Sequence, residues 1–223
     1  MFLKILQNHD NPESIVVLIN SFIRTDITID KILFLHDKYK FNIVLPIHEW
    51  FWFNVATNYS NKYHSIYLDE NMKLLENSKK LFDICSKIIC PSKFVYEMLY
   101  KHYPYEKVKQ INWIDYDLSN TSYNYKIEKN TQINIGILSF ISECKGKEQV
   151  QLLINKYRQN SNIKFLIVGY NIETYEDNCV GFINLIKKHN IHGLLYLNKW
   201  GETWCYSLSK AMYSGLPIFY NNI

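Results

Sequence analysis

Short apolar runs alternate with helical patterns along most of this 223-residue chain. In the first half, three helical patterns lie around residues 32–39, 74–85 and 94–99, and Ser92 is placed to cap the last of them. The runs between them have the length of buried strands and cover residues 14–20, 42–47, 86–90 and 110–114. This alternation is typical of an α/β protein.

The second half repeats the same rhythm after a polar, turn-rich segment. Val150, Leu153, Ile154 and Tyr157 follow helical spacing, and a second helix is indicated around residues 182–186. The predicted strands cover residues 133–138, 163–169, 193–197 and 216–220. We therefore predict a lobe over residues 1–117, a linker over residues 118–131 and a second lobe over residues 132–223.

Composition narrows the class of protein. A hydrophobic share of 48% and a charged share of 21% suit a soluble globular chain with a substantial core. The net charge of +4 is spread along the chain without a basic stripe, so no nucleic-acid partner is expected. Five cysteines without a CxxC pair indicate idle thiols in a reducing compartment. With no signal-peptide pattern and no apolar run of transmembrane length, we expect a cytoplasmic protein.

Two loops carry candidate chemistry. In the first, Lys145-Gly146 follows a predicted strand and opens a helix, so a lysine charge and free N–H groups could hold an anion. The alternative is a solvated lysine at a helix start. Both loops follow strands, and ligands of open α/β sheets bind at the carboxyl ends of strands.

The second loop, "GETWCYSLSK", leads into another helix. Thr203 is expected to cap it, leaving the N–H groups of Tyr206, Ser207 and Leu208 for a phosphate. Lys210 is expected to be exposed, opposite a core face of Leu208, Ala211, Met212 and Gly215.

Together these segments resemble the group 1 glycosyltransferases of the GT-B fold, retaining enzymes that use nucleotide sugars. "ISECKG" and "GETWCYSLSKAMYSGLP" carry the strongest part of the resemblance. "LPIHEWFWF" at residues 45–53 and "IICPSKFVYEML" at residues 88–99 are similar to two elements of the family's N-terminal lobe. The segments follow the family's order and cover most of the chain. The matching residues of the two strongest motifs are Lys145, Gly146, Glu202, Ala211, Gly215 and Pro217.

The resemblance implies an α/β fold of two Rossmann-like lobes of GT-B type, both incomplete, that meet at a cleft. It implies donor diphosphate contacts from Lys145, Gly146 and the helix that starts near Ser207. Glu202 would contact the donor sugar, and His48 would face it from the other lobe. Transfer of a hexose from a nucleotide-sugar donor would then proceed with retention, without a metal or cofactor, to a sugar, lipid or protein acceptor.

Three departures from the family pattern leave an alternative open. Lys210 replaces a glutamate that holds the ribose hydroxyls, and an ammonium only donates hydrogen bonds. Ser139 lies where many members have an arginine, and the chain ends before the family's closing helices. The alternative is a catalytically impaired nucleotide- or carbohydrate-binding relic, or a fragment of a larger multidomain protein.

Other signals are weaker. Asp115-Tyr116-Asp117 matches the D-x-D that holds Mg²⁺ or Mn²⁺ in GT-A glycosyltransferases, although so short a pattern arises by chance. The histidines show no zinc spacing, and no Walker A, G-x-S-x-G or G-x-G-x-x-G motif occurs. His48 could be purely structural. The aromatic run at residues 50–53 is expected in a core or interface, with an acceptor platform as the alternative.

Overall fold

The chain forms two compact units. One comprises Met1–Trp113 with Glu202–Trp204, and the other comprises Ile114–Gly201 with Cys205–Ile223. The computed structural model describes residues 2–21, 25–49, 52, 68–111, 132–137, 142–168, 176, 178–199 and 201–221. Residues 112–131 lie outside the described residues. The predicted linker and the predicted boundary at residue 117 fall within this stretch, and the predicted boundary at residue 132 falls at its edge.

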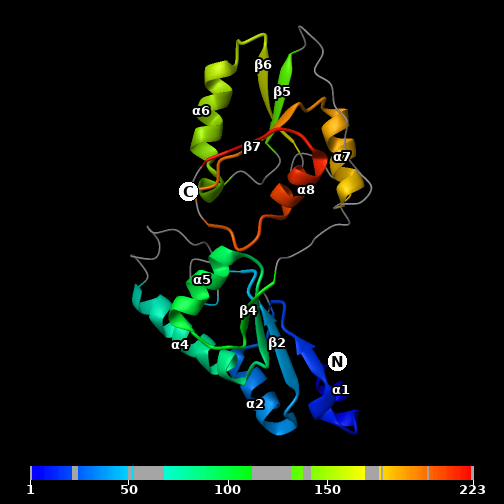
Figure 1. Cartoon of the computed structure of the whole chain (residues 1–223), viewed down its shortest axis with the longest axis vertical. Helices are drawn as coiled ribbons and strands as arrows, with labels where there is room; N and C mark the ends of the chain where they lie inside the picture. The colour runs from blue at the N-terminus through cyan, green and yellow to red at the C-terminus, as the bar shows by residue number, and fades with distance from the viewer. Residues whose placement is uncertain are drawn as a thin grey trace. The chain divides into compact units, whose positions relative to one another are not determined.

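The first unit is built on a parallel sheet in the order β1-β2-β3-β4 (Figure 1). Helix α2 packs beside α4, and α5 packs against β3 and β4. The strands are β1 (Val16–Leu18), β2 (Asn42–Pro46), β3 (Lys87–Cys90) and β4 (Val108–Gln110). The helices are α1 (Phe2–Asn8), the 3-10 turn η1 (Pro12–Ser14), α2 (Ile29–Tyr39), α4 (Leu68–Ile84) and α5 (Lys93–His102).

Local signals explain where two of these helices begin and end. The Thr28 hydroxyl accepts a hydrogen bond from the Lys31 N–H and caps α2, which ends at Lys40 in the left-handed conformation with φ +53°. The Ser92 hydroxyl accepts from the Val95 N–H, so the predicted cap of α5 is confirmed. Helix α1 was not predicted, and β4 begins two residues before the predicted strand.

Aromatic and aliphatic side chains fill the core of the first unit. Trp52 is 1% exposed and packs on Phe82 with ring centroids 6.1 Å apart, and Phe82 meets Tyr103 edge to face at 5.0 Å. Trp52 is thus a core residue, as expected for the aromatic run. Burial raises the pKa of the Cys85 and Cys90 thiols to about 12, which keeps both protonated and unreactive.

The second unit has a parallel sheet in the order β6-β5-β7-β8. Its strands are β5 (Ile133–Ile137), β6 (Ile163–Ile167), β7 (Gly193–Tyr196) and β8 (Ile218–Tyr220). Its helices are the 3-10 turn η3 (Glu143–Lys145), α6 (Lys147–Tyr157), α7 (Cys179–Lys188) and α8 (Tyr206–Ser214). The four strands match the four apolar runs predicted for this half.

Helices cover both faces of this second sheet (Figure 1). On one face, Val150 of α6 packs with Ile135, Ile137 and Leu195. A separate core on the other face joins α7 and α8 to the sheet and includes Phe182, Ile186, Leu194, Tyr196 and Ala211. Because both faces are buried, the central strands read as continuous apolar runs in the sequence.

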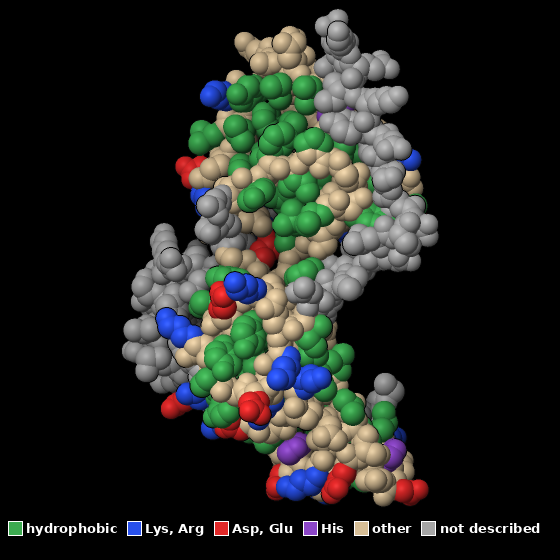
Figure 2. All heavy atoms as spheres, viewed as in Figure 1, with side chains coloured by type: hydrophobic (Ala, Val, Ile, Leu, Met, Phe, Trp, Pro, Cys, Tyr) green, Lys and Arg blue, Asp and Glu red, His purple; other side chains and the backbone are tan. Residues whose placement is uncertain are grey.

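Some hydrophobic side chains remain on the surface of the second unit (Figure 2). Met212 of α8 is 70% exposed, and Phe219 and Tyr220 of the edge strand β8 are 51% and 73% exposed. Within the described part of the chain, no helix combines the length and the apolar character needed to cross a membrane.

Candidate functional site

The candidate site lies in the second unit, where the order of the strands reverses. From β5 the chain moves to β6 on one side and later to β7 on the other. Strands β5 and β7 are adjacent and parallel, with Ile135 opposite Gly193, so their carboxyl ends share one edge of the sheet. Ligands of open α/β sheets bind at such a switch point. The two loops predicted to carry chemistry both leave from this edge.

The first loop places Lys145 in a tight turn before α6. The Lys145 N–H donates to the Ser142 carbonyl at 3.0 Å, and the Gly146 N–H donates to the Glu143 carbonyl at 3.2 Å. Gly146 then adopts a left-handed conformation with φ +76°, and α6 begins at Lys147. The predicted helix therefore starts directly after the Lys145-Gly146 pair, and Lys145 is half-buried at its entrance.

Gly146 is required by its contact with the second loop. A Cβ atom at this position would lie 2.2 Å from the backbone oxygen of Leu197, the first residue after β7. The positive φ also disfavours any residue with a side chain. A salt bridge of 3.6 Å between Lys199 Nζ and Glu148 Oε2 joins the same two segments again. The structure thus brings the two predicted loops together.

Helix α8 begins at the second loop, as predicted, but its cap differs from the prediction. Cys205 is the N-cap residue and its side chain makes no capping hydrogen bond. Thr203 was the predicted cap, and this is wrong because α8 begins three residues later, at Tyr206. The Thr203 hydroxyl instead donates to the backbone oxygen of His48 within the first unit. The Tyr196 hydroxyl donates to the Ser207 carbonyl at 2.8 Å and ties the first turn of α8 to β7. An α-helix provides no internal acceptor for its first N–H groups, and such a helix start can bind an anion.

The buried face of α8 also differs from the prediction. Lys210 is 4% exposed and Met212 is 70% exposed, whereas the expected positions were the reverse. The buried positions are Lys210, Ala211 and Ser214. Of the expected core face, Ala211 is in the core and Leu208 packs against it, whereas Met212 and Gly215 are exposed. Burying an ammonium is costly unless it is paired, so Lys210 is a specifically accommodated side chain and not a solvated one.

His48 lies two residues beyond β2 and is half-buried in the first unit. Burial lowers its pKa, and the adjacent Glu49 opposes this shift, so the imidazole is neutral at neutral pH. Glu49 Oε2 accepts a hydrogen bond from the Ser21 hydroxyl at 3.0 Å. A neutral imidazole can both donate and accept a proton, which suits a transfer step.

The predicted site residues divide between the two units. Glu202 is half-buried and belongs to the first unit with His48. The second unit holds the remaining described ones, namely Lys145, Gly146, Tyr206, Ser207, Leu208 and Lys210. Ser139 lies outside the described residues. The roles assigned to all of these residues remain predictions.

Sequence reasoning missed Leu197 as the neighbour of Gly146, because an apolar residue at the end of a strand gives no sign of a backbone contact. No group of three histidine, cysteine or acidic side chains that could hold a metal ion is found among the described residues. Asp115 and Asp117 of the D-x-D pattern lie outside that part of the chain.

Comparisons with known proteins identify the fold. No family model and no curated protein matches the sequence. Among solved structures, the chain is similar to Alr3699/HepE from Anabaena, in complex with UDP, with a TM-score of 0.55 and 12% identity over 97% of this chain. It is also similar to the GtfA/B complex (TM-score 0.52, 13% identity over 100% of this chain) and to the lipopolysaccharide outer core galactosyltransferase WaaB in its apo form (TM-score 0.51, 10% identity over 98% of this chain).

The chain spans 61%, 44% and 58% of these three chains, respectively. At such low identity the likeness establishes the fold alone. The fold is that of the GT-B glycosyltransferases, with a Rossmann-like α/β sheet in each unit, as the resemblance of the motifs implied.

Proposed function

We propose that this chain is all or part of a glycosyltransferase that binds a nucleotide-sugar donor at the carboxyl edge of its second sheet. The observation that carries the proposal is the close approach of Gly146 to Leu197, which joins the two motif-bearing loops at the switch point. The N-terminus of α8, which the Cys205 side chain does not cap, follows the second of these loops. The similar structures support this assignment, since one holds UDP and another is named a galactosyltransferase.

In this proposal the donor diphosphate is bound by positive charge and backbone N–H groups. Lys145 supplies a full charge, and the first turn of α8 at Tyr206, Ser207 and Leu208 supplies donors and a partial charge. Ser139 would add a hydroxyl donor. These groups stabilise the charge that develops on the departing nucleotide, so the reaction needs no metal ion.

Glu202 and His48 are assigned to the sugar and to the transfer step. Glu202 accepts hydrogen bonds from hydroxyls of a hexose, which is transferred with retention. His48 acts as a neutral imidazole on a group that gains or loses a proton. Removal of the His48 imidazole should therefore lower turnover while leaving nucleotide affinity unchanged.

A second candidate function is nucleotide or carbohydrate binding without catalysis. The observation that favours it is Lys210, which is 4% exposed at the position where the family has a ribose-binding glutamate. An ammonium cannot accept hydrogen bonds from the two ribose hydroxyls, which weakens the donor site. Donor binding without turnover would support this candidate.

Calorimetric titration with UDP and GDP, with and without EDTA, tests the proposal, and hydrolysis of UDP-hexoses then tests for catalysis. We expect micromolar to millimolar affinity that survives chelation. Loss of binding on chelation, restored by Mn²⁺, would instead implicate Asp115 and Asp117. If neither UDP nor GDP binds, the proposal is overturned.

A further inference from the structure

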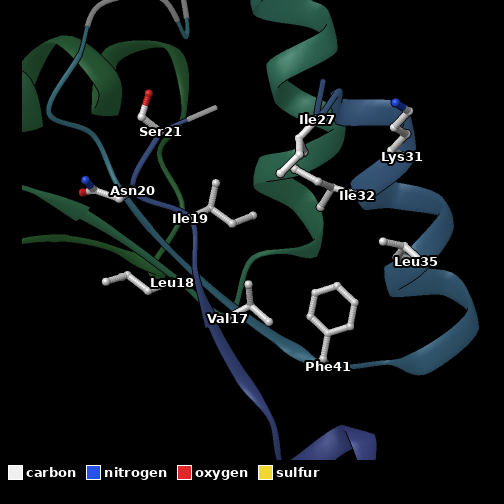
Figure 3. A pocket seen from close by; sticks show the side chains of 10 residues that line it. All are labelled: Val17, Leu18, Ile19, Asn20, Ser21, Ile27, Lys31, Ile32, Leu35 and Phe41. Atoms are coloured by element: carbon white, nitrogen blue, oxygen red, sulfur yellow. The ribbon is translucent and has the colours of Figure 1, made fainter. Parts of the chain in front are cut away.

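The first unit contains a cavity of about 350 Å³ between β1 and α2 (Figure 3). Figure 3 shows Val17 and Ile19 pointing from the strand side toward Ile32 and Leu35 of α2, with Phe41 closing one end. Phe41 is 1% exposed and Ile32 is 7% exposed, whereas Leu18 and Ile27 are 62% and 50% exposed, so the cavity is closed at Phe41 and reaches the surface elsewhere. The wall is therefore a continuous aliphatic and aromatic surface.

The size of this space distinguishes it from an ordinary packing defect. Protein interiors contain few voids larger than a water molecule. Ligand pockets begin at about 300 Å³ and have mostly apolar walls with a few polar groups, which matches this cavity. At about 30 Å³ for each water-sized group, the cavity would hold a chain of about ten carbon atoms.

The other end of the cavity is polar and lies at the carboxyl end of β1. Ser21 and Lys31 lie there with Ile27, at the end opposite Phe41 (Figure 3). Lys31 Nζ donates to the Asp26 backbone oxygen at 2.6 Å, which uses one of the three donors of an ammonium. Lys31 is the one charged residue among the ten that line the cavity. The Ser21 hydroxyl donates to the Glu49 carboxylate at 3.0 Å, so an anionic group would be bound on the α2 side of this end, beside Lys31.

We propose that this cavity binds the hydrocarbon chain of an amphiphile whose anionic head group lies beside Lys31. The apolar walls shield a chain of medium length from water, and burial of its methylene groups is the main source of affinity. If the proposed glycosyltransferase function holds, this amphiphile is the lipid acceptor of the reaction. Binding of the amphiphile to the cavity does not depend on that function.

The test is titration of the full chain with decanoate and with uncharged decanol, both below their aggregation concentrations. Val17→Phe and Leu35→Phe place a ring in the cavity and should each weaken binding of both ligands at least tenfold. Val16→Phe is the matched control, since Val16 belongs to the same strand, is 62% exposed and does not line the cavity. Thermal unfolding of each variant shows whether it is folded.

The charge is tested separately. Lys31→Gln should weaken decanoate binding several-fold and leave decanol unaffected, whereas Lys38→Gln, an exposed lysine of the same helix, should change neither. Failure of the wild-type chain to bind decanoate, or unchanged binding by folded Val17→Phe and Leu35→Phe, would overturn the proposal. Equal loss of both ligands in Lys31→Gln would overturn the head-group assignment. Titration of the same wild-type protein with UDP tests the proposed function independently, so failure of the cavity proposal and failure of the proposed function can be told apart.

Discussion

The strands beside the candidate nucleotide site and the strand beside the cavity differ in how far they are buried. In the second unit, all of β7 and the last three residues of β5 are buried, and each face of the sheet has its own core. In the first unit, Val16 and Leu18 of the edge strand β1 are each 62% exposed, and Val17 lines a cavity. The candidate nucleotide site is therefore built at the ends of buried central strands, whereas the cavity of the first unit lies beside an exposed edge strand.

The largest effect is expected at Gly146, where the two loops of the candidate site approach most closely. Gly146→Ala would place a methyl group 2.2 Å from the Leu197 oxygen and impose a left-handed conformation on alanine. The conformation costs about 1–2 kcal/mol and the overpacking a further 1–3 kcal/mol of folding stability. Relief of this strain separates the two loops, so UDP affinity should fall at least about tenfold. Calorimetry measures this loss.

Gly215→Ala is the matched control for Gly146→Ala. Gly215 has a similar φ of +72° but ends α8, away from its N-terminus. The Gly215→Ala substitution should lower the unfolding temperature but leave UDP affinity within about twofold of the wild-type value. Equal losses of affinity in the two variants would show that the close approach to Leu197 does not shape the site.

Two leucines compare the buried central strand β7 with the exposed edge strand β1. Leu194 of β7 is 0% exposed, so Leu194→Ala should lower the free energy of unfolding by about 2–5 kcal/mol. Leu18→Ala on the exposed side of β1 should lower it by less than about 1 kcal/mol. Chemical denaturation measures both. Similar losses of unfolding free energy in the two variants would contradict this difference between the buried and the exposed strand.

A smaller effect is expected from Lys210. Lys210→Glu restores the carboxylate that accepts from ribose hydroxyls, so UDP should bind roughly tenfold tighter while 2′-deoxy-UDP gains less. Because Lys210 is buried, Lys210→Met controls for the loss of its charge, and thermal unfolding controls for the fold of both variants. Equal weakening of both nucleotides would instead identify Lys210 as a phosphate ligand.

The strands of the second unit were predictable because burial on both faces demands continuous apolar residues. The runs at residues 133–138, 163–169 and 193–197 contain β5, β6 and β7 entirely. Ser92 was predictable as a cap because the signal is local to the helix start. The Lys145-Gly146 pair was found for the same reason, from its position between a strand and a helix.

The remaining features depend on contacts that no local pattern contains. Residue type alone placed Met212 in the core and Lys210 at the surface, but the packing of α8 buries the stripe that contains Lys210. The Thr203 hydroxyl donates to His48, 155 residues away in sequence, and the N-cap position of α8 falls at Cys205. The cavity beside Val17 arises from the spacing of β1 and α2, which the sequence does not state.

The smallest expected effect is on the pH dependence of stability. Burial lowers the pKa of His192 in the second unit, and its Nδ1 accepts a hydrogen bond from the Asn134 N–H at 3.0 Å. The unfolded chain takes up this proton near pH 6.5, before the folded chain does, so stability is complete above that pH and falls as the pH falls through it. His192→Gln should reduce this slope in denaturation series at several pH values. An unchanged slope in His192→Gln would contradict a buried, neutral imidazole.

The most direct test of the central claim is the affinity of the Lys145→Gln variant for UDP. The claim is that the edge of the second sheet binds a nucleoside diphosphate with Lys145 on the phosphates. Loss of one charge-assisted contact costs about 1.5–3 kcal/mol, so calorimetry should show affinity reduced about ten- to a hundredfold. Lys164→Gln, an exposed lysine on β6 of the same unit, should bind UDP as the wild-type chain does. Equal affinities of the wild-type chain and Lys145→Gln would contradict the account.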